Sequence, residues 1–345
     1  MARTAPTTRR VTLNEVARKA GVSVASASLV LAGKAAEMRL SAEVLARVEA
    51  AAIELDYIPN RLVHSLQQGS TQILAFLNGY RDRDVRDLYM DTLSSAIERA
   101  AGDLGFDVLV NCNFTRTPEQ MYRHLNGGHA DGLLFFAPAL EDPLLPFLRA
   151  SRMPTVLIGA HDKMNVISSV RDDAASGMRM VADALYSRGH RNIGVLTQSG
   201  MPDACDRTDM LRKFLGEKGV IIPDEWIIDY KGDSAPVLEQ MLRQSHRPTA
   251  LFCRTDRLAY ELLAKHNRVR SVPDSLSIVG YDGLIWPAET RHTVASVHVD
   301  LATLAREAVA LLISRIRQPD QPVVGLEIPV SFQEGTTLST VRTID

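Results

Sequence analysis

The stretch VTLNEVARKAGVSVASASLVLAG, residues 11–33, has the layout of two short helices joined by a glycine turn. Thr12 is a cap residue and Glu15 follows three positions later, which is the spacing of a capping box. Gly21 suits the corner because glycine adopts positive φ without steric cost. Ser23 then caps the second helix. The stretch predicts a helix-turn-helix; the alternative is an alanine-rich helical hairpin with no nucleic-acid role.

The second of these helices separates a core face from a face of small side chains. The positions with the helical spacing of a core face are Val24, Ala27, Val30 and Leu31. The positions expected to look outward are Ala25, Ser26, Ser28 and Leu29. Small residues near a helix start let its backbone approach a major groove, and free amides at helix ends bind phosphates. The pattern therefore favours DNA binding.

A third helix and a hinge complete this N-terminal region. The helix is predicted from Ser41, and its core face is expected to comprise Val44, Leu45, Val48, Ala52 and Leu55. It stops at YIPN, residues 57–60, because Pro59 restricts Ile58 to extended geometry. A short helical segment, RLVHSLQQ, then leads through Gly69 into an apolar strand. The predicted order is three helices, a hinge and a strand.

From residue 72 onward, short apolar strands alternate with helices. The strands are rich in β-branched or aromatic residues, as buried parallel strands are. They are ILAFLNGY (73–80), FDVLVNCNF (106–114), DGLLFFAP (131–138), MPTVLIGA (153–160), IGVLTQ (193–198), WIIDYKG (226–232), ALFCR (250–254), LSIVGYDG (276–283) and VASVHVD (294–300). This alternation predicts two doubly wound lobes.

Ligands of open parallel sheets bind at the carboxyl ends of the strands, which nominates a set of binding residues. They are Asp87, Tyr89, Arg171, Asp172, Arg207, Arg254, Thr255, Asp256, Asp282 and Trp286. Carboxylates and arginines suit vicinal hydroxyls, and an aromatic face packs on a sugar ring. The alternatives are that Asp172 and Asp256 cap the helices after them and that Trp286 packs in a lid. Three arginines in one set also suit an anionic ligand, such as a sugar acid or sugar phosphate.

Charge is unevenly distributed along the chain. The net charge is −2, but the first forty residues carry a basic excess. There, two glutamates (Glu15 and Glu37) stand against Arg3, Arg9, Arg10, Arg18, Lys19, Lys34 and Arg39. The excess lies where DNA contact is proposed; the alternative is a solvated basic face or a disordered tail.

The remaining composition predicts a soluble cytoplasmic protein. The N-terminal string MARTAPTTRRVTLN has no apolar core, and no apolar run reaches the roughly 18 residues of a membrane helix. The three cysteines, Cys112, Cys205 and Cys253, are far apart, which is typical of reduced thiols. No cofactor or metal pattern is present in the sequence. We therefore expect neither a cofactor nor a metal.

Several strings, taken in order, resemble the lactose/galactose repressor (LacI/GalR) family of bacterial transcription regulators. They are TLNEVARKAGVSVASAS, YIPNRLVHSL, DGLLFF, VRDDAASGMRMVADALYSRGHRNIGVL and PDSLSIVGYDG. The resemblance implies an N-terminal all-α helix-turn-helix head plus an α/β region of two doubly wound, periplasmic-binding-protein-like lobes. We expect the head at 1–57, the hinge at 58–70 and the effector-binding and dimerisation domain at 71–345. Lobe 1 is expected at about 71–168 and 299–323, and lobe 2 at about 169–298 and 324–340.

The resemblance also implies a function. Such a protein is a sequence-specific repressor that binds a palindromic operator as a homodimer, since one small head reads only a few base pairs. A sugar or sugar derivative in the interlobe cleft controls it, commonly through residues at the places of Arg207, Asp256 and Asp282. Induction by the ligand is the default, and corepression is the alternative. No leucine-heptad tail follows residue 335, so a coiled-coil tetramer is not expected.

By the same resemblance, a set of residues is expected to contact DNA through the major groove, the phosphates and the minor groove. They are Thr12, Ser23, Val24, Ala25, Ser26, Ser28, Leu29, Arg39, Asn60, His64 and Leu66. Leu66 matches the family's wedge, which kinks the duplex at a central base step. Leu29 departs from the arginine that relatives carry, so the base read there is expected to differ. Thr255 similarly replaces a usual asparagine, and the loop GYRDRDVRDLY, residues 79–89, is unusually charged.

An enzyme and a pure sugar-binding module are the two other functional classes for such a chain. An enzyme is not expected, because the sequence has no GxxxxGK[ST], HExxH or GxSxG pattern. His190 is a tempting base, but it matches a structural turn of the family, so packing is the expected role. Exported periplasmic sugar-binding proteins share the lobes but carry a signal peptide where this chain has its head. A pure sugar-binding module is the other alternative, and a gel shift with the chain's own upstream DNA distinguishes it from a regulator.

Overall fold

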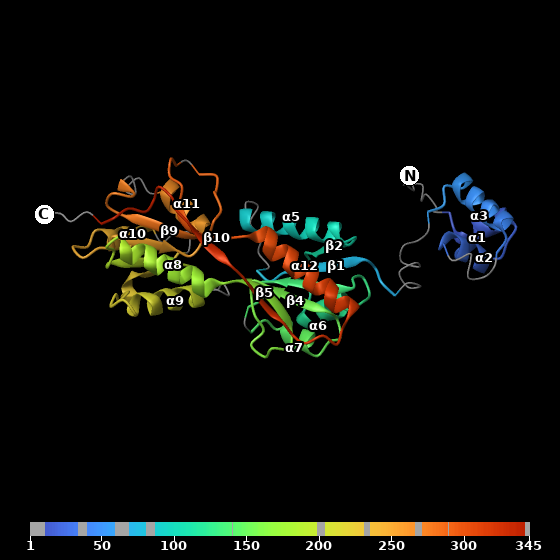
Figure 1. The fold of residues 1–345 in the computed structure, drawn as a ribbon, viewed down its shortest axis with the longest axis horizontal. Coiled ribbons are helices and arrows are strands. Elements are labelled where there is room, and N and C mark those ends of the chain that lie inside the picture. Colours follow the sequence, from blue (N-terminus) through green and yellow to red (C-terminus); the bar gives the residue numbers. More distant parts are fainter. Residues whose placement is uncertain are drawn as a thin grey trace, which may run out of the picture. The chain divides into compact units, whose positions relative to one another are not determined.

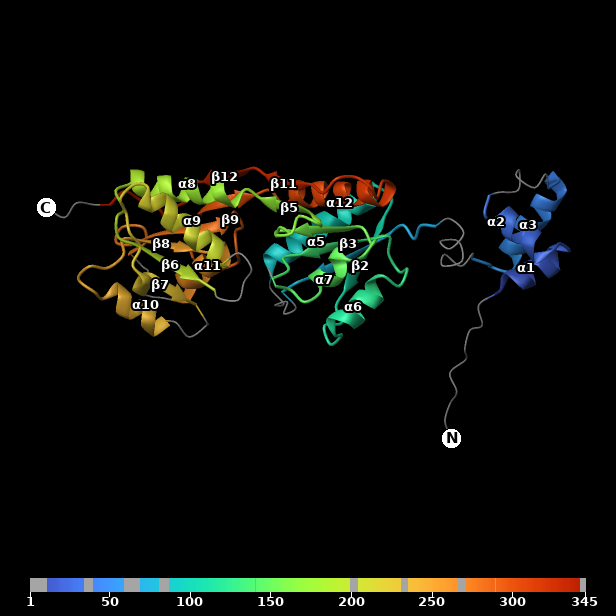
Figure 2. The ribbon, with the colours of Figure 1, turned by 90° about the horizontal axis from the view of Figure 1, so that it is seen from below.

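The computed structural model describes residues 11–33, 40–58, 69–80, 87–139, 141–198, 204–230, 235–265, 271–288 and 290–341. The chain divides into two compact units, Met1–Gln72 and Ile73–Asp345, and each is described by itself. Figures 1 and 2 show a small helical unit and a larger α/β unit. No helix among the described residues is long and apolar enough to span a membrane.

The first unit contains three helices, α1 (Leu13–Ala20), α2 (Val24–Leu31) and α3 (Ala42–Glu54). The predicted capping pair forms: the Glu15 carboxylate accepts from the backbone N–H of Thr12 at 2.7 Å and from its hydroxyl at 2.8 Å. Gly21 turns the chain between α1 and α2 with φ of 65°. Ser41 caps α3, accepting from the Val44 amide at 3.3 Å. The helix-turn-helix predicted from residues 11–33 is therefore confirmed.

The core of the first unit lies where the three helices meet. Its buried members are Val16, Ala17, Ala20, Ala27, Val30, Val48, Ala51 and Ala52. One expectation was wrong: Val24 shares the helical spacing of the core face but is 43% exposed. It is the first residue of α2, and a side chain there lies beyond the end of the helix–helix contact. Val24 is therefore available on the surface beside Ala25.

The described residues of the second unit form two six-stranded sheets. In the first, the order is β11-β5-β4-β3-β1-β2, and all the pairings are parallel. Its strands are β1 (Ile73–Asn78), β2 (Asp107–Asn111), β3 (Gly132–Phe136), β4 (Thr155–Ile158), β5 (Ser168–Asp172) and β11 (Gly325–Ile328). Its helices are α5 (Leu88–Asp103), α6 (Pro118–Leu125), α7 (Leu145–Arg149) and α12 (Leu301–Arg317).

The helices of this first lobe cover both faces of the sheet because strand side chains alternate. Along β1, Leu74 and Phe76 join the cluster that contains residues of α5 and α12. Ala75 and Leu77 join the opposite cluster, with residues of α6 and α7. Figure 1 accordingly shows α5 and α12 on one side of the sheet and α6 and α7 on the other. Continuous apolar strands are buried on both faces, as the sequence predicted.

The second lobe repeats this arrangement with the sheet order β12-β10-β9-β8-β6-β7. Its strands are β6 (Ile193–Thr197), β7 (Ile227–Asp229), β8 (Ala250–Cys253), β9 (Ser277–Asp282), β10 (Ala295–Val299) and β12 (Val330–Gln333). Its helices are α8 (Ala174–Ser187), α9 (Ala204–Gly216), α10 (Ala235–Leu242) and α11 (Asp256–Lys265). The helices α8 and α9 cover one face, and α10 and α11 cover the other (Figure 1). Only β12, among the described strands, pairs antiparallel, with β10.

The chain passes between the lobes three times, after β5, after β10 and after β11. Strand pairing assigns residues 168–172 and 325–328 to the first sheet. The expected lobe borders, near 168 and 323, therefore lie a few residues short of the observed passages. The reason is that β5 and β11 are short and partly polar, so their sequences lack the apolar run by which the other strands were recognised. The strand β12, VSFQ, escaped prediction for the same reason, whereas the helix α7 has only five residues and is too short to show helical periodicity.

Asp162, in the loop before β5, has a fully buried carboxylate that holds this loop together. Arg149 donates to it through Nη2 at 2.7 Å and Nε at 3.0 Å. The loop amides that donate to it belong to Met164, Val166 and Ile167. Burial alone would raise the pKa of Asp162, but the hydrogen bonds from Arg149 and the loop amides outweigh it and lower the pKa.

Replacing Asp162 with asparagine should lower the free energy of unfolding by about 2 kcal/mol near neutral pH. Because the folded pKa is depressed, this stabilisation is present above the unfolded pKa of about 3.9 and is lost as pH falls through the folded pKa. Urea unfolding at several pH values should show the difference shrink below about pH 4. The control Glu119→Gln removes an exposed ion pair with Arg123 and should change little. A difference independent of pH would contradict this account.

Candidate functional site

The exposed start of α2 is the part of the first unit that fits a nucleic acid. Ser23 caps the helix, and its hydroxyl accepts from the Ser26 amide at 3.0 Å. The two serine hydroxyls lie 2.9 Å apart. Val24 and Ala25 follow on the surface, with no long side chain to hold a groove away. A helix start with small exposed residues and free amides is suited to approach DNA closely.

Of the other residues expected to contact DNA, the structure describes three and leaves four outside the described residues. Thr12 lies at the exposed start of α1, where its hydroxyl donates to Glu15. Ser28 and Leu29 are half-buried, farther along α2. The remaining four, Arg39, Asn60, His64 and Leu66, lie outside the described residues.

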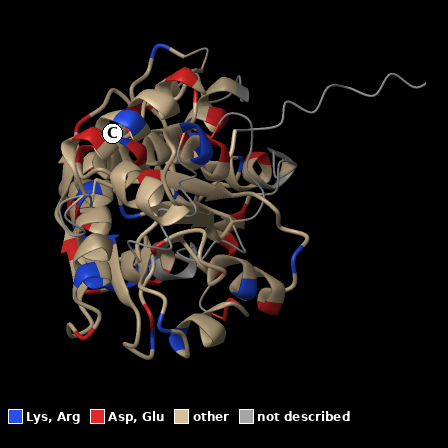
Figure 3. Ribbon diagram, turned by 90° about the vertical axis from the view of Figure 1, so that its right-hand side faces the viewer, with Lys and Arg blue, Asp and Glu red and all other residues tan. Residues whose placement is uncertain are grey.

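The electrostatics of the described helices are not strongly basic. Of the seven basic residues in the first forty, Arg18 and Lys19 are described, and Lys19 forms an ion pair with Glu54 of α3. The other five lie outside the described residues. Figure 3 shows acidic and basic residues interspersed along the ribbon. The basic excess that sequence analysis associates with phosphate contact therefore belongs mainly to segments flanking the three helices.

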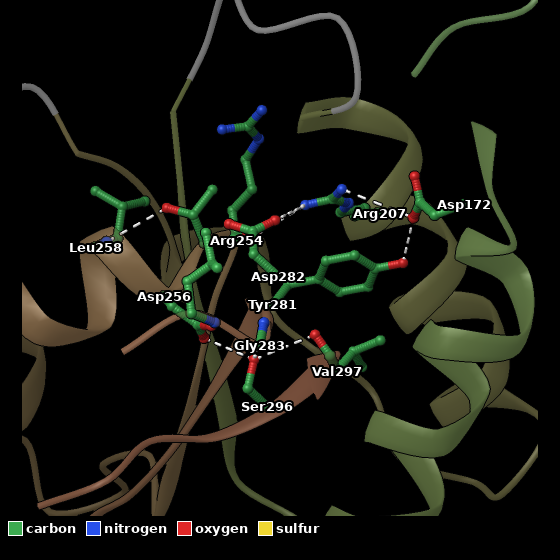
Figure 4. A network of polar contacts seen from close by, with 12 residues as sticks. Asp172, Arg207, Arg254, Asp256, Leu258, Tyr281, Asp282, Gly283, Ser296 and Val297 are labelled. Atoms are coloured by element: carbon green, nitrogen blue, oxygen red, sulfur yellow. Dashed lines mark hydrogen bonds and ion pairs between the residues drawn. The ribbon is translucent and has the colours of Figure 1, made fainter. Parts of the chain in front are cut away.

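In the second unit, a buried polar network forms where strands of the two sheets end (Figure 4). Arg207 of α9 lies between two carboxylates, 3.9 Å from Asp172 of β5 and 3.8 Å from Asp282 of β9. Its guanidinium lies 3.7 Å above the ring of Tyr281 and donates to the Arg254 carbonyl at 3.1 Å. The Tyr281 hydroxyl donates to Asp172 at 2.5 Å. Residues from both lobes thus meet at one cation.

Burial sets the charge state of this network. The side chains of Arg207, Asp172 and Asp282 are 8%, 12% and 6% exposed. Burial and the neighbouring Asp172 raise the pKa of Tyr281 well above its ordinary value. Its phenol therefore stays protonated and donates to the carboxylate. The network offers hydroxyl donors, carboxylate acceptors and a guanidinium within one small region.

Tyr89, an aromatic residue of the first lobe, lies near the Asp172 and Asp282 carboxylates of the network. Burial and the nearby Asp172 and Asp282 carboxylates raise the pKa of Tyr89 well above its ordinary value. Its ring lies 5.8 Å from Phe136, at the end of β3, and Tyr80 lies 5.5 Å from the same ring. These aromatic faces, beside carboxylates and a guanidinium, make the surroundings that a sugar ring requires.

Asp256 is buried, but its contacts differ from those of Asp282. Its carboxylate accepts from the Ser296 hydroxyl at 2.6 Å and from the Leu284 amide at 2.7 Å. Burial raises the pKa of Asp256 to about 7, against the lowering effect of these hydrogen bonds. The cap of α11 is instead Thr255, whose hydroxyl accepts from the Leu258 amide at 3.3 Å. The carboxylate therefore neither caps the helix, as the alternative held, nor ion-pairs with Arg207 within 4 Å.

Two other residues nominated from the sequence have separate structural roles. Asp87 caps α5, accepting from the Met90 amide at 3.1 Å. Arg171 bonds His161 at 3.2 Å and Glu327 at 2.5 Å. Successive side chains of a strand point to opposite faces, so Arg171 points away from the face that Asp172 uses. The expected convergence of three arginines is therefore wrong for Arg171.

Trp286 and Arg254 are the remaining residues nominated from the sequence. Trp286 packs against the second lobe's core, and the Arg257 guanidinium lies 5.5 Å from its ring. Its indole nitrogen is buried without a partner among the described residues. Arg254 is 4% exposed, and its side chain extends away from Asp282 in Figure 4. Arg254 thus takes part in the network through its backbone carbonyl, which accepts from Arg207.

Sequence reasoning missed Tyr281, Ser296 and Phe136. The rule that selects residues after strands overlooks residues within them, and all three lie inside apolar strands. A signal did exist for Tyr281, because a tyrosine hydroxyl in a buried strand requires a partner. His190 was correctly expected to be structural: its ring nitrogens lie 2.9 Å from the Thr249 hydroxyl and from the Ser339 carbonyl.

A small hollow lies on the other face of the first lobe's sheet. Its lining includes Asn78, Arg116, Phe135 and Asp142. Phe135 and Phe136 are neighbours in β3, so the hollow and the Tyr89 side of the sheet are separated by the sheet itself. The hollow is therefore distinct from the Arg207 network.

Comparisons with known proteins match both units. Residues 12–60 match the family model described as "Bacterial regulatory proteins, lacI family". Residues 182–338 match the "Periplasmic binding protein-like domain". The HTH-type transcriptional repressor PurR of Photobacterium profundum is 25% identical over 315 residues, covering 89% of this chain and 92% of the relative. PurR of Salmonella enteritidis is 28% identical over 335 residues, covering 92% and 94%.

Solved structures share the fold. The lac repressor dimer bound to operator and the anti-inducer ONPF has a TM-score of 0.77 at 23% identity, covering 97% of this chain and 100% of that one. The transcriptional regulator CelR in complex with cellobiose has a TM-score of 0.66 at 23% identity, covering 95% and 100%. The fold, the two model matches and the nearly full-length similarity to curated repressors agree. The chain thus carries a lacI-family DNA-binding domain and a periplasmic-binding-protein-like domain, and over nearly its full length it is similar to repressors built in the same way.

Proposed function

We propose that this chain is a sequence-specific transcriptional repressor that binds a palindromic operator as a homodimer and responds to a sugar-like effector. The observation that carries the proposal is the exposed, Ser23-capped start of α2 in a unit that matches the lacI model. The curated relatives are transcriptional repressors, which supports regulation rather than catalysis. Such a protein acts in the bacterial cytoplasm, where the operator is.

For DNA recognition, we assign α2 to the major groove. Val24 and Ala25 approach base edges, while Ser23, Ser26 and Ser28, with Thr12, favour phosphates. Leu29 offers no hydrogen bond, so it reads a thymine methyl or packs. Outside the described residues, we assign phosphate contact to Arg39, minor-groove contact to Asn60 and His64, and the kinking wedge to Leu66. The operator should therefore differ from those that relatives read with arginine.

For the dimer, the edge of the first lobe's sheet offers a contact surface. The edge strand β2 exposes two large apolar side chains, Leu109 at 39% and Val110 at 43%. An exposed apolar edge strand is a liability unless a partner covers it, and a second copy is the partner that a palindrome requires. Sedimentation should find dimers at operator-binding concentrations; monomers at those concentrations would contradict the proposal.

For the effector, we infer that Arg207, Asp172, Asp282 and Tyr89 form the binding site. Arg207 lies 3.8 and 3.9 Å from the two carboxylates, so a guanidinium donor and two acceptors stand close together. Sugar hydroxyls can accept from the guanidinium while donating to a carboxylate, so they fit there. The argument for an anionic effector relied on three arginines close together. Arg171 pairs with Glu327 instead, so one of these three cations is absent from the site. We therefore favour a neutral sugar.

The mechanism that follows is a two-state switch. The network joins Asp172, on the first lobe's sheet, to residues of the second lobe, so a ligand there favours one lobe arrangement over another. The lobe arrangement in turn sets operator affinity through the hinge, residues 60–68, which lies outside the described residues. Induction and corepression differ only in which arrangement the effector prefers.

The test is a gel shift with the full chain and the DNA upstream of its own gene. We expect that DNA to be retarded at concentrations that leave a shuffled duplex of equal length free. Ribose, cellobiose, glucuronate and glucose 6-phosphate are then added, and their binding is measured by calorimetry. A change in retardation by a neutral sugar is the expected response. Equal retardation of both duplexes contradicts the regulator, and binding of the anions alone contradicts the neutral effector.

A further inference from the structure

Asp256 occupies a position that links three elements of the second lobe. It is the first residue of α11 and is only 1% exposed. Its carboxylate accepts from the Leu284 amide, in the loop after β9, at 2.7 Å. It also accepts from the Ser296 hydroxyl, on β10, at 2.6 Å, and Ser296 in turn accepts from the Gly283 amide at 3.3 Å. One carboxylate therefore fastens the segment that directly follows Asp282 (Figure 4).

That segment carries backbone strain. Asp282 has φ of 115°, in the region that residues with a side chain rarely adopt. Such a conformation persists only where the surrounding structure holds it, and it clusters at ligand-binding positions. In this conformation the Asp282 carboxylate lies 3.8 Å from Arg207. Contacts to the residues just beyond Asp282 must therefore hold the backbone in this conformation.

The neighbouring glycines show how closely the chain packs here. A Cβ on Gly280 would lie 2.0 Å from the Asp256 carboxylate, so only glycine lets this carboxylate approach β9. A Cβ on Gly283 would lie 2.4 Å from the His298 ring, and Gly283 also has φ of 74°. Gly280 thus admits the Asp256 carboxylate, and Gly283 admits His298 against the segment that Asp256 and Ser296 contact.

We propose that Asp256 is a positioning residue: with Ser296, it clamps Gly283 and Leu284 and thereby holds Asp282 in the strained conformation that presents its carboxylate to Arg207. This inference rests on the proposed effector site, and it replaces the expectation that Asp256 contacts the effector itself. The specificity of the site then depends on a residue that does not touch the ligand.

The variants Asp256→Asn and Asp256→Ala test whether the hydrogen bonds of Asp256, and not only the size of its side chain, hold the segment after Asp282. In Asp256→Asn, the amide oxygen still accepts from Leu284, and the amide nitrogen donates to Ser296, whose hydroxyl can turn to the Val297 carbonyl at 3.3 Å. In Asp256→Ala both contacts are lost. Thr255→Ala is the matched control, because it removes the cap of α11 one residue away and leaves the clamp intact.

The first measurement is amide hydrogen exchange in the full chain, followed over the peptide 281–288. We expect Asp256→Ala to speed exchange of the Leu284 amide at least about tenfold, whereas Asp256→Asn and Thr255→Ala stay near the parent chain. Equal exchange in Asp256→Ala and the parent would overturn the clamp. So would a matching acceleration in Thr255→Ala, since that would make the effect one of helix stability.

The second measurement is a double-substitution cycle on urea unfolding. If Asp256 acts by holding Asp282 near Arg207, the destabilisation caused by Asp282→Asn should fall to about half or less in the Asp256→Ala background. In the Thr255→Ala background it should be unchanged. Additive effects of Asp256→Ala and Asp282→Asn would refute the positioning role. Neither measurement uses an effector, so a failure of the proposed ligand site is seen separately, in the calorimetry.

Discussion

Replacing Ala25 with glutamate should weaken operator binding by on the order of a hundredfold, about 2.7 kcal/mol, while leaving the fold intact. Ala25 is exposed on the first turn of α2, next to the exposed Val24. A glutamate there brings a negative charge toward phosphates and a long side chain between the helix and the groove floor. Because the position contributes nothing to the core, the thermal unfolding midpoint should not change.

The matched control for this substitution is Ala42→Glu. Ala42 is also exposed and also begins a helix, α3, so the change in composition and net charge is identical. Fluorescence anisotropy on the operator duplex at fixed salt should show near-parental affinity for Ala42→Glu and the large loss for Ala25→Glu. Equal losses would mean that total charge, not the placement of α2, governs binding, and our assignment of the reading face would then be wrong.

The head was predictable from sequence because its determinants are local. The capping pair Thr12–Glu15, the corner at Gly21 and the cap Ser23 each act within one helical turn. Such contacts depend on sequence spacing alone. The one error, Val24, arose because helical periodicity does not say where along a helix its neighbour ends.

The strands of the lobes were predictable where their sequences form a continuous apolar run. The apolar strands of both sheets were expected, whereas β5 and β11, which carry SSVRD and GLEI, were missed. The strand β11 lies at the edge of the first sheet, and β5, which is paired on both sides, ends in the half-buried polar residues Arg171 and Asp172. Edge strands lose the continuous apolar run on which recognition depended.

The site was only partly predictable because its contacts join residues far apart in sequence. The strand-end rule correctly brought Arg207, Asp172 and Asp282 together. It could not separate Arg171 from Asp172, since that depends on which face of β5 is covered. The rule also could not predict the hydrogen bond from Ser296 of β10 to Asp256, because that contact depends on how the strands are aligned with one another.

Replacing Arg207 with alanine should lower the free energy of unfolding by about 3 kcal/mol and abolish effector binding. The substitution leaves two buried carboxylates, Asp172 and Asp282, without the cation that lies between them. Two buried carboxylates without a counter-ion repel each other and have lost their hydration. The destabilisation therefore exceeds the loss of the attraction to Arg207 alone. It also removes the cation that lies 3.7 Å over the Tyr281 ring.

The chain contains a close control for this prediction in Arg179. Its guanidinium also pairs with a carboxylate, Glu217 at 3.1 Å, and also lies over an aromatic ring, Phe214 at 4.0 Å. Its side chain, however, is 52% exposed, so Arg179→Ala should cost less than about 1 kcal/mol. The contrast isolates burial as the cause, because the two arginines make the same kinds of contact.

Arg207→Lys distinguishes charge from shape at the same position. Lysine keeps the positive charge between Asp172 and Asp282, so much of the lost stability should return in urea unfolding. It has no planar fork, so it cannot serve both carboxylates and the Arg254 carbonyl in one geometry. Effector affinity, measured by calorimetry with the sugar that shifts the operator gel, should therefore remain low although the fold is restored. If Arg207→Lys instead recovered affinity and stability together, a point charge would suffice, and the proposal that the guanidinium orients sugar hydroxyls would be wrong.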